Sequence, residues 1–397
     1  MILRTFRWSF GITAIALVGA LVLGGLKGLT LVAILIVLEI SLSFDNAVVN
    51  ATILERMSAF WQKMFLTVGI LIAVFGMRLL FPLLIVAVTA KLNPVEAVNL
   101  ALAGGSAEAP GTYAYLLREA HPSIAAFGGM FLFILFLDYI FEDRDIRWLT
   151  WLERPLARVG KLDQVSVVVG LVVLVLTAEL LAKEPATVMV AGALGLVTYL
   201  LVNGLGSLFE QAGDDDDDKT DDEMAPVARR GGPTGVAKAS GRAGFFLFLY
   251  LEVLDASFSF DGVIGAFAIT QDIFIIATGL GVGAMYIRSL TVYLIRKGTL
   301  NDYVYLEHGA HWAIGALAVI LFVSIKTDVP EIVTGLIGVG FIAAAFVSSL
   351  VRNRRLGDDA DDADDPDRPD GHDGIGGIGG DPDGSATDAA RSVSTAG

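Results

Sequence analysis

Two apolar stretches decide the fold: LVAILIVLEISLSFDNAVVNA at residues 31–51 and FFLFLYLEVLDASFSFDGVIGAFAIT at residues 245–270. Each has the roughly 20 residues that a helix needs to cross a membrane. Yet both stretches contain carboxylates, namely Glu39 and Asp45 in the first and Glu252, Asp255 and Asp261 in the second. An ionised side chain at mid-membrane costs at least about 2.5 kcal/mol, so these five residues indicate a functional site.

The two stretches also share a motif. Ser-Phe-Asp occurs at residues 43–45 and again at residues 259–261, each time near the middle of the apolar run. The stretches therefore resemble two copies of one element, as in transporters built from internal repeats.

Composition sets the class of the protein. Hydrophobic residues make up 54% of the 397 residues, and the formal net charge is −15. Residues 210–243 hold nine acids against five bases, and residues 357–397 hold twelve against two. The remainder is nearly neutral, so the acidity describes solvated segments and gives no indication of a nucleic-acid partner. Because the chain has no cysteine, disulfides, thiolate metal sites and cysteine nucleophiles are excluded.

The hydrophobic runs predict an all-α, polytopic membrane protein with about ten transmembrane helices. The runs cover residues 8–25, 29–52, 62–90, 123–141, 164–182, 186–208, 244–269, 272–295, 309–326 and 330–351. The predicted organisation is an N-terminal transmembrane half at 1–208 that includes two extra helices, an acidic linker at 209–243, a C-terminal transmembrane half at 244–351, and a disordered acidic tail at 352–397.

The distribution of Lys and Arg predicts the orientation. With a cytoplasmic N-terminus, nineteen of these bases fall in cytoplasmic segments and five in outside segments. This bias predicts a plasma (inner) membrane protein whose termini and acidic linker are cytoplasmic. The two motif helices are the second and seventh runs, so they cross the membrane in opposite directions. The halves are therefore predicted to have inverted topology, an architecture of secondary transporters.

Polar residues follow one face of each motif helix. Glu39, Ser43, Asn46 and Asn50 are spaced i, i+4, i+7 and i+11, and Asp255 and Ser259 repeat the spacing. Ordinary hydrogen bonding between helices is an alternative reason for the serines and asparagines.

Asp45 and Asp261 lie about 100° from this face on an ideal helix. They reach the same pocket only at its edge, or if the helix is kinked or broken nearby. Gly262 and Gly265 favour such a break in the second copy.

The buried charges do not balance. Arg78 and Arg288 are the only bases near mid-membrane, and Asp138 adds a sixth acid. Structural pairing with arginine is one interpretation, but two arginines cannot neutralise all the acids. Protons or a bound cation would balance the rest, and oxygen ligands favour hard divalent ions such as Mn²⁺, Mg²⁺ or Ca²⁺. The predicted metal ligands are Glu39, Asp45, Asn46, Glu252, Asp255 and Asp261, with Ser43, Asn50, Arg78, Asp138, Ser259 and Arg288 as supporting or charge-balancing residues.

At these residues the chain resembles a known family. The stretch Glu39-Ile-Ser-Leu-Ser-Phe-Asp45-Asn46 is similar to the first signature of the TerC family of integral membrane proteins, and Asp255-Ala-Ser-Phe-Ser-Phe-Asp261 is similar to its second half. The resemblance covers about residues 28–90 and 244–350 and is strongest to a longer branch of that family. Gly262 departs from the pattern, because the family commonly has serine there.

The resemblance implies a relationship to the LysE-type transporter superfamily, a role in metal homeostasis with Mn²⁺ export as the activity, and a link to tellurite resistance. We therefore expect an exporter of a divalent metal, with Mn²⁺ as substrate, proton antiport as the hypothetical coupling and no tightly bound cofactor. A non-transporting partner that delivers metal is an alternative. An intramembrane aspartyl enzyme is the weakest one, since the chain lacks Gly-x-Gly-Asp, His-Glu-x-x-His and Gly-x-Ser-x-Gly motifs.

Overall fold

The computed structural model describes residues 2–144, 146–162, 164–217, 241–297 and 303–363. Within these ranges the secondary structure is helical and contains no strand, which confirms the predicted all-α class. The helices are α1 (Ile2–Leu42), α2 (Phe44–Glu55), α3 (Ala59–Leu71), the π-helix η1 (Ile72–Leu80), α4 (Phe81–Thr89), α5 (Pro94–Ala103), α6 (Tyr113–Phe141), α7 (Thr150–Val159), α8 (Val165–Leu181), α9 (Pro185–Asp217), α10 (Gly241–Ile269), α11 (Ile273–Lys297), α13 (Leu306–Ser324) and α14 (Glu331–Ala363).

The chain divides into two compact units, Met1–Arg352 and Asn353–Gly397. Helix α9 continues to Asp217, inside the predicted linker, and α14 continues to Ala363, inside the predicted tail. All the contacts described below lie within the first unit.

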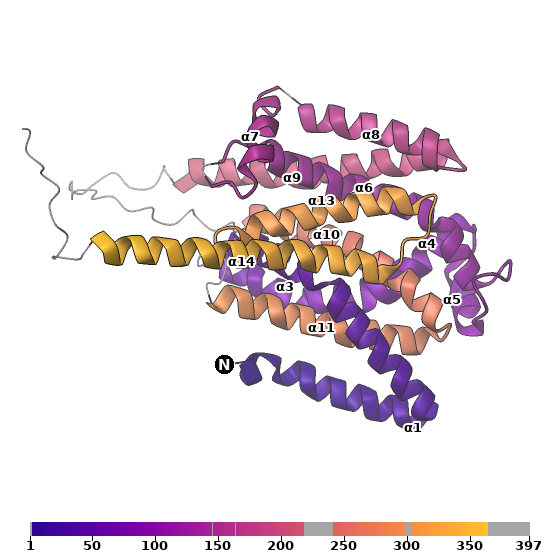
Figure 1. Ribbon diagram of the computed structural model, residues 1–397. Coiled ribbons are helices and arrows are strands. Elements are labelled where there is room, and N and C mark those ends of the chain that lie inside the picture. The colour runs from indigo at the N-terminus through magenta and orange to yellow at the C-terminus, as the bar shows by residue number, and fades with distance from the viewer. Residues whose placement is uncertain (1, 145, 163, 218–240, 298–302, 364–397) are drawn as a thin grey trace, which may run out of the picture. The chain divides into compact units, whose positions relative to one another are not determined.

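Eight helices of the described residues are long and apolar enough to cross a membrane. The prediction of about ten spans differs for two reasons. Helix α1 contains two of the predicted runs, and it bends between them at Gly25, whose φ of 61° and ψ of −158° are not helical. Helix α8 has 17 residues, about 26 Å of length, which is at the lower limit for a span. Figure 1 shows α1 folding back on itself at this bend.

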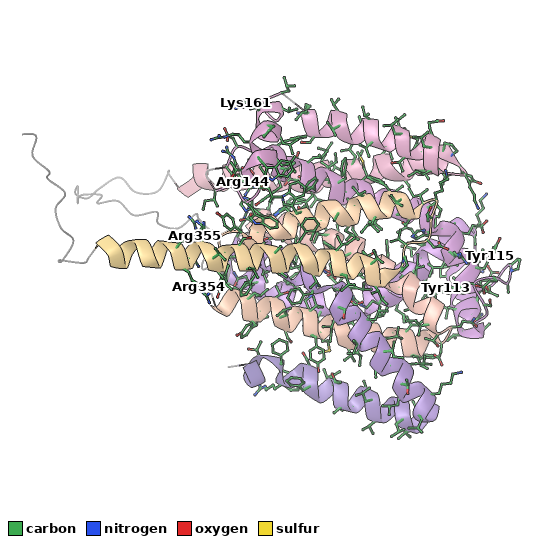
Figure 2. The ribbon with its side chains drawn as sticks, viewed as in Figure 1. Tyr113, Tyr115, Arg144, Lys161, Arg354 and Arg355 are labelled. Carbon is green, nitrogen blue, oxygen red and sulfur yellow. The ribbon has the colours of Figure 1, made fainter. Side chains whose placement is uncertain are left out.

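The two ends of the helix bundle differ in their side chains. Arg144 and Lys161 lie at one end, and Tyr113 and Tyr115 lie at the opposite end (Figure 2). Basic residues at one membrane interface and aromatic residues at an interface are both typical of membrane proteins.

Helix α6 forms the centre of the largest core. In its most apolar window 78% of the residues are buried, compared with 22% in α1. Its Met130, Phe131 and Ile134 pack in one cluster with side chains of α9, α10 and α13. A Cβ atom built at Gly195 of α9 would lie 2.2 Å from the carbonyl oxygen of Phe127, so glycine is required for α9 to pack this closely on α6.

The two motif helices cross antiparallel. Asn46 of α2 contacts Asp255 of α10, and Glu39 of α1 lies next to Gly262 of α10. Moving from α1 to α2, the residue numbers increase, whereas those of their neighbours on α10 decrease. This register fits the predicted inverted topology. The first motif helix is interrupted at Ser43, between α1 and α2, whereas α10 is continuous. The prediction of a break at Gly262 and Gly265 is therefore wrong, because the break lies in the first copy, at Ser43.

The helix that follows each motif helix packs against the opposite copy. Gly283 of α11 lies on Glu39, and Gly69 of α3 lies on Glu252 and Arg288. A Cβ atom at Gly283 would be 2.5 Å from the Cβ and Cγ of Glu39. Glycines at these two contacts therefore set the spacing between the halves.

We expect Gly283→Ala to lower the thermal stability of the purified protein, because the added methyl forces α11 away from α1, and such overpacking costs about 1–3 kcal/mol. The matched control is Gly19→Ala, since a Cβ atom at Gly19 has no neighbour within 4 Å. Thermal unfolding in detergent is the measurement. Equal unfolding temperatures for the two variants would contradict this account of the contact.

Candidate functional site

The first charged cluster consists of Glu39, Ser43 and Arg78. All three side chains are buried. The Nη2 atom of Arg78 donates to Oε1 of Glu39 in an ion pair, and the Ser43 hydroxyl donates to the same oxygen over 3.0 Å. Nη1 of Arg78 donates to the carbonyl oxygen of Ala73 over 2.6 Å. One carboxylate and one guanidinium make this cluster electrically neutral.

Arg78 lies in the π-helix η1. A π-helix places carbonyl groups out of the ordinary α-helical ladder and is frequent at functional sites. Here it brings the carbonyl of Ala73, five residues earlier, to the side chain of Arg78. The local distortion therefore helps to hold a buried guanidinium facing Glu39.

The second charged cluster consists of Glu252, Asp255 and Arg288, which are also buried. Nη2 of Arg288 lies 3.6 Å from Oε1 of Glu252 and 3.6 Å from Oδ2 of Asp255. These are ion-pair distances but too long for hydrogen bonds. The guanidinium instead donates to two carbonyl oxygens of α3 over 3.2 Å each, at Phe65 and Gly69, and lies 3.5 Å from the centre of the Phe65 ring.

The two clusters are related by the sequence repeat. Aligning the two Ser-Phe-Asp motifs pairs Glu39 with Asp255 and Asn46 with Gly262. The amide of Asn46 donates to Oδ1 of Asp255 over 2.6 Å, and the equivalent contact on the other side is Gly262 against Glu39. A Cβ atom at Gly262 would lie 3.3 Å from Oε2 of Glu39. Thus Glu39, the longer acid, faces Gly262, and Asp255, the shorter acid, faces Asn46.

The charges of the clusters differ. The same alignment pairs Glu252 with Ile36, so the second cluster has one acid without a counterpart. Two carboxylates share Arg288, whereas Glu39 has Arg78 to itself. With all groups ionised, the second cluster therefore carries one excess negative charge in a buried setting. Such a charge needs a proton or a cation.

Several buried polar atoms of α2 and α10 are unpaired. Both carboxylate oxygens of Glu252, Oδ2 of Asp255 and Oδ1 of Asn46 have no hydrogen-bond partner among the described residues. The same holds for both amide atoms of Asn50 and the hydroxyl of Ser259. Buried polar atoms are nearly always hydrogen-bonded in proteins, so a bound cation could satisfy the oxygens of this group, and water could satisfy the oxygens and the Asn50 nitrogen.

Two other predicted residues lie apart from the clusters. The carboxylate of Asp45 faces α14, where a Cβ atom at Gly338 would be 2.9 Å from its Oδ2. Asp138 accepts a hydrogen bond of 2.6 Å from the hydroxyl of Tyr199 in α9. Its partner is a neutral phenol, so this hydrogen bond does not offset the charge of the carboxylate. The side chain of Asp261 lies outside the described residues.

The predicted ligands do not all converge on one point. In the described part of the chain, no three Asp, Glu or His side chains form a group that could hold a metal ion. Glu39 lies next to Gly262 of α10, and Asp255 contacts Asn46 of α2. These two contacts lie at different points along the motif helices.

Sequence reasoning missed some contributors to the site. Gly69, Gly283 and the carbonyl oxygens of Phe65 and Ala73 all shape the clusters. The spacing of Gly279 and Gly283 on one face of α11 was a usable signal, since small residues at i and i+4 mark close helix contacts in membranes. The carbonyl partners left no signal, because every residue has a carbonyl group.

One protein family, described as "Protein of unknown function (DUF475)", matches residues 44–356. The match covers most of the chain. The chain belongs to the DUF475 family. In this DUF475 protein the matched residues contain the whole second charged cluster, together with Asn46 and Asn50, but not Glu39 or Ser43. No curated protein and no solved structure matches the chain.

The pairing of long acid with glycine and short acid with asparagine is testable by a double-mutant cycle. Gly262→Asn alone should crowd Glu39, and Glu39→Asp alone should weaken the contact with Arg78, so each should destabilise the protein by about 1–3 kcal/mol. The double variant reproduces the Asp255–Asn46 arrangement. Its loss of stability should be smaller, by at least about 1 kcal/mol, than the sum of the losses in the two single variants. Unfolding midpoints in detergent provide the measurement. Strictly additive effects would contradict the symmetry that relates the clusters.

Proposed function

We propose that this DUF475 protein transports a divalent cation across the membrane, with the second charged cluster as its binding site. The observation that carries the proposal is the excess carboxylate at Arg288, together with the unpaired Oδ1 of Asn46, whose side-chain amide contacts Asp255. A divalent ion there would find two carboxylates and an amide oxygen, the ligands preferred by hard cations. The antiparallel crossing of two polar helices supports transport, because substrate sites of inverted-repeat transporters lie at such crossings.

The resemblance to the TerC family supports Mn²⁺ as the substrate and export as the direction. Moving a doubly charged ion outward against about 100 mV, inside negative, costs about 4.6 kcal/mol. Export therefore needs an energy source, and we propose proton antiport. Carboxylates that bind either a metal ion or protons provide that coupling without a second site. In this proposal the protein lies in the plasma membrane with both termini in the cytoplasm.

Glu252→Gln is the sharpest test. It removes the excess charge and leaves Asp255 and Arg288 as a neutral pair, so the variant should fold normally. We expect Mn²⁺ flux per folded molecule in proteoliposomes to fall at least about tenfold, which corresponds to about 1.4 kcal/mol of binding free energy. Stabilisation by Mn²⁺ in thermal unfolding should fall with it.

Two variants complete this experiment. Glu179→Gln, at an exposed carboxylate of α8, makes the same chemical change away from the clusters and should retain flux. Arg288→Gln leaves two buried carboxylates without a counterion and should instead destabilise the fold, by about 3–5 kcal/mol. Full flux in folded Glu252→Gln would exclude this cluster as the cation site. Metal-dependent stabilisation without any flux in the parent protein would favour a metal-delivery partner.

The sequence repeat yields a separate prediction for its two aspartates. Asp45→Asn and Asp261→Asn keep size and remove charge; if the repeated aspartates take part in transport in addition to the second charged cluster, each variant should abolish Mn²⁺ export while expression is retained. Ser43→Ala should have a much smaller effect, because that hydroxyl donates to Glu39, which Arg78 already neutralises. Flux per folded molecule is again the measurement. Full export by either Asn variant would remove that aspartate from the mechanism.

A further inference from the structure

A cleft lies between the first segment of α1 and helices α3 and α11. Its volume is about 660 Å³, within the range of about 300–1,000 Å³ that is usual for ligand pockets. Two arginines line it, the exposed Arg7 of α1 and the buried Arg288 of α11. The cleft therefore reaches Arg288 of the second charged cluster, whereas Glu252 and Asp255 do not line it.

The polar groups of the cleft are positively charged or neutral. Besides the arginines, Ser9 and Ser289 line it, and their hydroxyls are 2.8 Å apart. No carboxylate is in the lining. Glu252 and Asp255 offset the charge of Arg288, so Arg7 provides the main electrostatic attraction. The cleft therefore attracts an anionic group at its Arg7 end, and not at Arg288.

The walls and the position of the cleft select for an amphipathic ligand. Leu66 and Ile70 of α3 form part of the wall, and both lie in a helix predicted to span the membrane. Arg7 is near the start of the first span, whereas Arg288 lies nine residues, or about 14 Å, before the end of α11. The cleft thus extends from a membrane interface toward mid-depth, with space far beyond that of one phosphate ion.

We propose that this cleft binds an anionic phospholipid, with the headgroup phosphate at Arg7, hydroxyl or ester groups at Ser9 and Ser289, and an acyl chain along Leu66 and Ile70. Basic pockets between transmembrane helices bind lipid headgroups in this way. Because Arg288 also lines the cleft, the deeper part of the bound lipid lies next to the counterion of Glu252 and Asp255. The lipid would then modulate cation binding, and this last link rests on the proposed function.

Binding is tested on the full chain, purified in neutral detergent and free of added metal, so that failure of the transport proposal does not affect the result. Titration with phosphatidylglycerol, followed by native mass spectrometry, should show a bound lipid with at least tenfold higher affinity than phosphatidylcholine. Inorganic phosphate should not compete at the same concentration. Equal affinity for the two lipids would overturn the role of Arg7, and competition by inorganic phosphate at the lipid's concentration would make the cleft a phosphate-ion site.

Variants localise the effect. Arg7→Gln should weaken phosphatidylglycerol binding about fivefold, the effect of one basic residue near a membrane surface. Lys63→Gln removes an exposed charge of α3 that does not line the cleft and should leave affinity unchanged. Ile70→Trp should block the cleft without a change in charge. Equal losses in Arg7→Gln and Lys63→Gln would overturn the proposal, and because Arg7 is exposed this comparison stands even if Ile70→Trp does not fold.

Discussion

Two buried arginines hold the centre of this protein together. Each guanidinium is surrounded by groups from other helices, because a charge removed from water must find opposite charge and hydrogen-bond acceptors nearby. Arg78 of η1 binds Glu39 of α1, and Arg288 of α11 binds carboxylates of α10 together with carbonyl oxygens of α3. The hydrogen bonds from Arg288 to α3 join the two copies of the repeat, so the same residue contributes to the packing of the halves and to the chemistry of the site.

Close helix packing makes those ion pairs possible. Gly69 and Gly283 let α3 and α11 approach the motif helices until acid and arginine share one low-dielectric space. In such surroundings electrostatic interactions are strong, and unpaired charge is costly. The cost of unpaired buried charge also explains why the two clusters are suited to different roles. A one-to-one pair at Glu39 is suited to stability, whereas two acids at Arg288 leave a charge that a mobile cation can satisfy.

The asymmetry between the copies has a recognisable pattern. Where one side has Glu39 against Gly262, the other has Asp255 against Asn46, so a longer acid faces the smallest residue and a shorter acid faces an amide that adds hydrogen-bonding capacity. The unpaired oxygens gather on the side of Asn46 and Glu252. Divergence of an internal repeat can thus keep the packing of one copy and change the chemistry of the other.

The sequence by itself determined the class of fold and the position of the polar helices. Apolar runs of spanning length, the bias of Lys and Arg, and the repeated Ser-Phe-Asp require no tertiary information, since they reflect transfer of each segment from water to lipid. The acids of the site were visible for the same reason. What only the tertiary structure decided was the pairing: Arg288 with two acids, Arg78 with one, Asp138 with Tyr199, and Asp45 facing α14. It also placed the helix break at Ser43, where the glycines had indicated the other copy. Pairing depends on distances of a few ångströms between different helices, and sequence spacing fixes such distances only within a single helix.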